Sequence, residues 1–96
     1  LRIDGLRVLY RLELSPPEAL LGCAVDVPTL NGLVTLQVPP RSSSGRLLRL
    51  RSRGLEYEEL KGDQLVEIIV TIPSEVSDAE LALYQRLQEL ANNYDS

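Results

Sequence analysis

The 96-residue sequence contains no histidine, phenylalanine, tryptophan or methionine, and Cys23 is its only cysteine. Without histidine and with one thiol, the chain cannot assemble a Ser-His-Asp or Cys-His nucleophile, a closed Cys/His zinc site or an internal disulfide. Cys23 stands between Gly22 and Ala24. No cationic neighbour in the sequence would lower its pKa, so we interpret it as a small buried apolar residue. We therefore expect no catalytic residue, no metal ligand and no cofactor.

Long apolar runs are also missing. None approaches the about 18 residues of a membrane-spanning helix, and residues 1–5 do not resemble a signal peptide. We expect a protein without membrane association and with a cytoplasmic location. The apolar share of 44% and the length fit one compact domain. Because the first residue is Leu1 and not methionine, we expect a segment of a longer protein.

The charge is unevenly distributed, although the net charge is −4. Residues 41–53 contain five arginines and no acid, and most of the acids follow. A basic segment can follow a phosphate backbone, which makes nucleic-acid binding at Arg41–Arg53 one interpretation. The chain lacks the Phe and Trp platforms on which bases stack. Arg49 and Arg51 alternate with Leu48 and Leu50, as on the solvated face of a strand, and this interpretation is favoured.

Period-2 alternation of apolar residues predicts strands at residues 6–14, 23–27, 34–38, 47–51 and 65–72. The last of these has apolar residues on both faces and is expected to be central in its sheet. Asn31-Gly32 predicts a tight hairpin turn in which both residues have positive φ. Residues 54–63 are expected to form a loop.

Two helices are predicted. Ser15-Pro16-Pro17-Glu18 combines an N-cap serine, an early proline and a capping-box glutamate, and Gly22 would end this short helix. Ser77 and Glu80 form a second capping box ahead of an amphipathic helix near residues 78–92. Its apolar stripe consists of Leu83, Leu87, Leu90 and Tyr94. Either the domain's own sheet or a second chain must cover this stripe.

Short motifs in a fixed order and spacing extend over nearly the whole chain. They are Glu18-Ala19-Leu20-Leu21-Gly22, Val27-Pro28-Thr29-Leu30-Asn31-Gly32, Val38-Pro39-Pro40, Ser44-Gly45, Leu48-Arg49-Leu50-Arg51, Gly54 and Gly62-Asp63. This set of motifs resembles the second C-terminal domain of J-domain (DnaJ) co-chaperones. Four residues differ from the usual family pattern, which has glycine at the positions of Arg41 and Ser52, alanine at Leu20 and leucine at Gln64.

The resemblance implies a mainly β fold: a small two-layer β-sandwich-like domain with one short internal helix and a C-terminal amphipathic helix. Residues 1–76 would form the β domain and residues 77–96 a dimerisation helix, with the stripe described above as the homodimer interface. A client-binding groove would lie between the strands that flank the short helix. The corresponding positions are Tyr10, Leu12, Val25 and Val27, for which burial in an ordinary core is the favoured alternative.

The implied function is non-catalytic binding of unfolded client polypeptides. The implied partner is the seventy-kilodalton heat-shock chaperone, reached through an upstream J-domain whose His-Pro-Asp motif cannot lie in a chain without histidine. Nucleic-acid binding through Arg41–Arg53 remains the alternative, although we expect no nucleic-acid partner. An enzyme is a distant third, because Glu56, Glu58 and Glu59 lie in an expected loop with no partner base.

Overall fold

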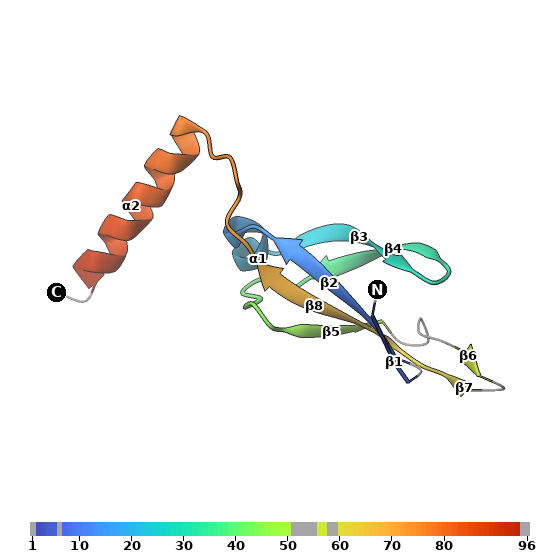
Figure 1. Ribbon diagram of the computed structural model, residues 1–96. Helices are drawn as coiled ribbons and strands as arrows, with labels where there is room; N and C mark the ends of the chain where they lie inside the picture. The colour runs from blue at the N-terminus through green and yellow to red at the C-terminus, as the bar shows by residue number, and fades with distance from the viewer. Residues whose placement is uncertain (1, 6, 51–55, 58–59, 95–96) are drawn as a thin grey trace.

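The computed structural model describes residues 2–5, 7–50, 56–57 and 60–94. It shows a mainly β domain from which a C-terminal helix projects (Figure 1). The elements are β1 (Arg2–Asp4), β2 (Arg7–Leu14), α1 (Pro16–Leu21), β3 (Cys23–Thr29), β4 (Gly32–Val38), β5 (Leu47–Leu50), β6 (Glu56–Tyr57), β7 (Leu60–Lys61), β8 (Gln64–Val70) and α2 (Asp78–Tyr94).

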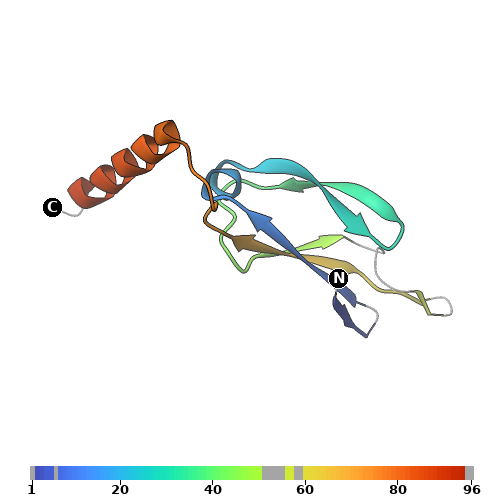
Figure 2. The same ribbon diagram turned by 45° about the horizontal axis from the view of Figure 1, so that its top comes forward.

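The β domain has two layers, as the family resemblance implied (Figure 2). One layer is a sheet with the strand order β1-β2-β8-β5, and the other is the β3-β4 hairpin. The central position of β8 confirms the prediction for the last strand. β8 pairs parallel with β2 and antiparallel with β5. The short helix α1 carries the chain from the first layer to the second.

The core lies between the layers and follows from the alternation of each strand. In β2 the even-numbered residues face the hairpin, and Val8, Leu12 and Leu14 are buried. In β8 Val66 and Ile68 are completely buried in the same way. The hairpin contributes Val27, Leu36 and Val38, and α1 contributes Ala19. Successive strand residues point to opposite faces, so the odd-numbered residues of β2 and β8 form the outer face of the sheet.

The hairpin is present, but its turn lies one residue earlier than predicted. Thr29 pairs with Gly32, so that Leu30 and Asn31 form a two-residue loop. Among the described residues, Gly32 has a φ of 107°, whereas Arg41 is the one non-glycine residue with a positive φ. Asn31 therefore does not adopt the predicted conformation. The Thr29 hydroxyl instead fixes the turn, accepting from the Asn31 amide at 3.1 Å and donating to the Gly32 carbonyl at 2.6 Å.

The expected loop at residues 54–63 contains a small additional hairpin, made by the two-residue strands β6 and β7. Two residues are too short for an alternation pattern to be recognised. β1 was missed for the same reason, because it has three residues.

Both predicted capping boxes are present. In the first, the Ser15 amide and hydroxyl donate to Glu18 Oε1 at 2.9 and 2.8 Å. The backbone bond, followed by the side-chain bond, lowers the pKa of Glu18 below its ordinary value. In the second, the Ser77 amide donates to Glu80 Oε1 at 3.2 Å and the Glu80 amide donates to Ser77 Oγ at 3.1 Å. These bonds satisfy helix N-terminal donors and begin α1 and α2 where the sequence predicted.

Candidate functional site

The edge of β2 is open over its second half. β1 pairs with Arg7, Val8 and Leu9, and no described strand pairs with residues 10–14 on that side. Figure 1 shows β1 beside the first part of β2 alone. The open segment of β2 leads into α1. An open strand edge presents main-chain donors and acceptors to which another extended chain can pair.

The hydrogen-bond register identifies which main-chain groups face this edge. The Val8 amide donates to the Asp63 carbonyl at 3.1 Å, and the Leu14 carbonyl accepts from the Thr71 amide at 2.9 Å. The even-numbered residues of β2 therefore direct their main-chain groups toward β8. Because main-chain groups alternate along a strand, Arg11 and Glu13 direct theirs toward the open edge. We call residues 10–14 the β2 edge.

The four predicted client-binding residues differ in exposure. Leu12 is 8% exposed and Val27 is completely buried, so both belong to the core, as the alternative interpretation held. Tyr10 and Val25 are half-buried and pack against the core from its margin. Of the four, Tyr10 and Val25 are thus the two with surface that a bound chain could cover.

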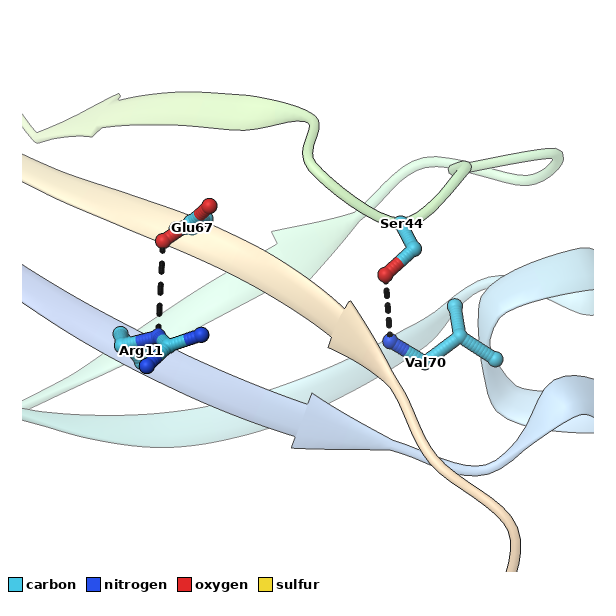
Figure 3. A network of polar contacts seen from close by, with 4 residues as sticks. All are labelled: Arg11, Ser44, Glu67 and Val70. Carbon is cyan, nitrogen blue, oxygen red and sulfur yellow. Dashed lines mark hydrogen bonds and ion pairs between the residues drawn. The ribbon is translucent and has the colours of Figure 1, made fainter.

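The outer face beside the β2 edge is polar. Arg11 Nε lies 3.5 Å from Glu67 Oε1 on the adjacent strand β8, as Figure 3 shows. Within the basic segment, Arg49 Nε lies 3.5 Å from Asp63 Oδ2. Arg49 is exposed and lies on this outer face, as the solvated-strand interpretation expected. Arg51 and Arg53 lie outside the described residues.

The apolar stripe of α2 is not covered by the domain's own sheet. Leu83, Leu87 and Leu90 are 67%, 59% and 49% exposed, and Figures 1 and 2 show α2 extending away from the β layers. The helix continues to Tyr94, two residues beyond the predicted end, but the Tyr94 side chain lies outside the described part of the structure. The sequence left two ways to bury this stripe, against the domain's own sheet or against a second chain. The structure does not show the first.

A second apolar group at the start of α2 joins the helix to the preceding segment. Val76 and Leu81, which flank the capping box as a hydrophobic staple does, line one pocket together with Ile72, Pro73 and Tyr84. Val76 and Leu81 are 37% and 50% exposed, so this group is open to solvent. Of the stripe residues, Leu83 and Leu90 project from the side of α2 opposite to Leu81, because the helix has about 3.6 residues per turn.

The other residues considered for catalysis or metal binding show little reactive chemistry in the described part of the chain. Burial, followed by the nearby Glu18 charge, raises the pKa of the Cys23 thiol, which disfavours the reactive thiolate. No cluster of metal-ligating side chains and no helix able to cross a membrane occurs in the described ranges. Of the three glutamates weighed for catalysis, Glu56 lies in β6 without a described side chain, and Glu58 and Glu59 are outside the described residues.

A hollow beside α1 was not predicted. Pro16, Ala19 and Leu20 of α1, loop residues 41–43 and Val70 of β8 line it. The one signal in the sequence was Arg41, which replaces the usual glycine of the resembled family. Its φ of 60° lies in the left-handed region, which glycine adopts without a side-chain clash.

Comparisons with known proteins agree with this architecture. The DnaJ C terminal domain family matches residues 1–73. Chaperone protein DnaJ 2 of Synechocystis sp. is 42% identical over 91% of this chain and 29% of its own length. Chaperone protein DnaJ of Salinibacter ruber is 45% identical over 88% of this chain and 22% of its own length. The Curved DNA-binding protein of Coxiella burnetii is 42% identical over 91% of this chain and 28% of its own length.

The chain spans less than a third of the length of these relatives. The family match covers every strand of the described domain and ends before α2. Together with the two-layer β fold, this match means that the chain belongs to the DnaJ C terminal domain family.

Proposed function

We propose that this chain is a non-catalytic polypeptide-binding and dimerisation module of a J-domain co-chaperone that acts in protein folding in the cytoplasm. The single observation that carries the proposal is the open β2 edge, with the main-chain groups of Arg11 and Glu13 directed toward it. An unfolded client is an extended chain with unpaired main-chain groups. Pairing through the main chain would accept many client sequences.

The two faces of the β2 edge would determine which client side chains are accepted. In an added strand, alternate side chains point to opposite faces of the sheet. Those on the inner face would meet Tyr10 and Val25, which are apolar and half-buried. Those on the outer face would meet the Arg11–Glu67 ion pair. We infer that client segments with apolar residues at every second position bind best, with micromolar or weaker affinity for so small an interface.

The exposed α2 stripe supports a homodimer. Leucines at three helical positions are in solvent in the single chain, and pairing with the same stripe of a second copy would bury them. Residues 77–96 would then be the dimerisation element and residues 1–76 the client-binding domain. Two client-binding domains on one dimer would raise the avidity for a long unfolded chain.

The partnership with the seventy-kilodalton heat-shock chaperone is inferred from the DnaJ relatives. Within that partnership this domain would supply client binding. Stimulation of ATP hydrolysis would require the His-Pro-Asp motif, and the 96 residues contain no histidine. Addition of this domain alone to the chaperone should therefore leave the hydrolysis rate unchanged.

Nucleic-acid binding is the second candidate, because a relative at 42% identity carries the name Curved DNA-binding protein. The structure offers a weak basis for it. Arg11 and Arg49 pair with Glu67 and Asp63, so two arginines of the outer face are partly neutralised. Binding to a phosphate backbone would weaken steeply as salt rises, whereas apolar peptide binding would not. An affinity for duplex DNA that falls by about tenfold or more between low and physiological salt would favour this second function.

Peptide affinity measured by fluorescence anisotropy tests the main proposal. The probe is a labelled, unstructured peptide with alternating leucine and serine. Val25→Asp should weaken binding by about tenfold, because it places a charge where an apolar side chain docks. Gln37→Asp is the matched control, since Gln37 is exposed on the outer face of the hairpin. Circular dichroism shows whether Val25→Asp folds, and Tyr10→Ser provides a second change at the same edge. Equal affinity of all four proteins would contradict the proposal.

A further inference from the structure

The hollow beside α1, lined as described above, has an apolar interior. Its floor includes Ala19, which is 3% exposed, and the half-buried Val70. Leu20 stands at its margin with 60% of its surface exposed. We call this site the α1 hollow. It shares no residue with the β2 edge.

Hydrogen bonds hold the wall of the α1 hollow in place. The Arg41 and Ser42 amides donate to the Leu20 and Ala19 carbonyls, each at 2.9 Å. The Ser42 hydroxyl donates to the Pro39 carbonyl at 2.6 Å. The Val70 amide donates to Ser44 Oγ at 3.0 Å, which ties the loop to the end of β8 (Figure 3). The hollow is therefore formed before any ligand arrives, which reduces the entropy lost on binding.

One cationic side chain, Arg41, lines the α1 hollow. The Arg41 side chain is exposed and makes no hydrogen bond or ion pair with any described residue. Glu18, the acid within α1, already accepts two hydrogen bonds from Ser15. The guanidinium of Arg41 is thus available to a carboxylate from another molecule, and a guanidinium can bind a carboxylate through two parallel hydrogen bonds.

We propose that the α1 hollow binds an acidic peptide segment in which an apolar side chain stands next to an aspartate or glutamate. The apolar side chain enters the hollow between Ala19 and Val70, and the adjacent carboxylate pairs with Arg41. A family member with the usual glycine at position 41 would have the hollow without the positive charge. The site therefore gives this chain a charge-selective contact in addition to peptide addition at the β2 edge, and it does not depend on that addition.

NMR titration of the whole chain tests the proposal. The probe is an octapeptide of glycine and serine with one central Leu-Asp pair. The matched control peptides carry Leu-Lys or Ser-Asp at the same positions. The Leu-Asp peptide should shift the amide signals of Ala19, Leu20 and Ser43 in a saturable way. Its affinity should exceed that of both controls by about threefold or more, as expected for an exposed ion pair and for one apolar side chain.

Variants at position 41 separate charge from structure. Arg41→Gly relieves the positive φ and should retain the fold while reducing the Leu-Asp affinity to that of the Leu-Lys peptide. Arg41→Glu should reverse the preference, so that Leu-Lys binds more tightly than Leu-Asp. Equal affinities for the three peptides, or shifts at Tyr10 and Val25 alone, would overturn the proposal. Shifts at Ala19 and Leu20 that appear on concentrating the protein without peptide would also overturn it, because a second copy would then fill the hollow.

Discussion

Gln64 Nε2 donates a hydrogen bond to the Pro28 carbonyl at 2.8 Å and thereby joins the two layers of the domain. Gln64 is completely buried in β8, and Pro28 belongs to β3 in the hairpin. The other polar atom of the side chain, Oε1, is buried without a hydrogen-bond partner among the described residues. One amide thus both stabilises the sandwich and carries an unsatisfied acceptor, which costs free energy.

Substitutions at Gln64 should separate these two effects. Gln64→Ala removes the hydrogen bond and leaves a cavity, so the free energy of unfolding should fall by about 2 kcal/mol or more. Gln64→Leu restores the volume and removes the unsatisfied oxygen, and it should cost less than half as much. Urea denaturation measures both values. Equal losses for the two variants would contradict this separation and show that the bond to Pro28 dominates, because both substitutions remove it.

The observed turn predicts that substitutions at two adjacent residues, Asn31 and Gly32, have different effects on stability. Gly32→Val should lower the free energy of unfolding by about 1 kcal/mol or more, because a β-branched residue is strained at a φ of 107°. Asn31→Ala should change it by less than about 0.5 kcal/mol, since Asn31 is exposed and does not have a positive φ. Denaturation midpoints measure both variants. Comparable losses of stability in the two would support the originally predicted turn, centred on Asn31-Gly32, instead.

The dimer proposal depends on Leu87, in the middle of the α2 stripe. Leu87→Asp places a charge in the paired interface and should raise the dimer dissociation constant by about tenfold or more. Gln85→Asp is the control, because Gln85 is exposed on the opposite side of the helix. Sedimentation equilibrium over a concentration series measures both. The β domain should stay folded, because Leu87 is already 59% exposed in the single chain.

Two results would contradict the dimer. The unmodified protein could sediment as a monomer at the highest concentration, which would leave the stripe without a second copy. Alternatively, Leu87→Asp could unfold the β domain, which would place Leu87 in the intramolecular core.

Local sequence patterns predicted most of the individual elements but not their assembly. Alternation located β2 and β8, and the serine–glutamate pairs located the starts of α1 and α2. The parallel pairing of β2 with β8 is not visible in alternation, because it joins strands about half the chain apart and depends on the whole fold. The conformation of Gly32 was predicted correctly, whereas Asn31 was not, since the Thr29 hydroxyl supplies a different turn.

The same limit applies to the candidate site, whose residues could be named from the sequence but whose exposure could not. The family resemblance implied Leu12 and Val27 together with Tyr10 and Val25, although the first two are core residues and only the latter pair lies at the margin. Distinguishing them requires knowledge of which residues of β2 and β3 the two layers cover when they pack, which is a tertiary property. The α1 hollow likewise combines residues from three separate segments.

Amide hydrogen exchange at the β2 edge tests most directly the central claim that an extended polypeptide adds there. The measurement compares the chain alone with the chain saturated by the alternating leucine–serine peptide. The account predicts slower exchange at Arg11 and Glu13, whose amides face the open edge, with little change at Tyr10 and Leu12, whose amides already face β8. Unchanged exchange at Arg11 and Glu13 with the peptide bound would contradict it.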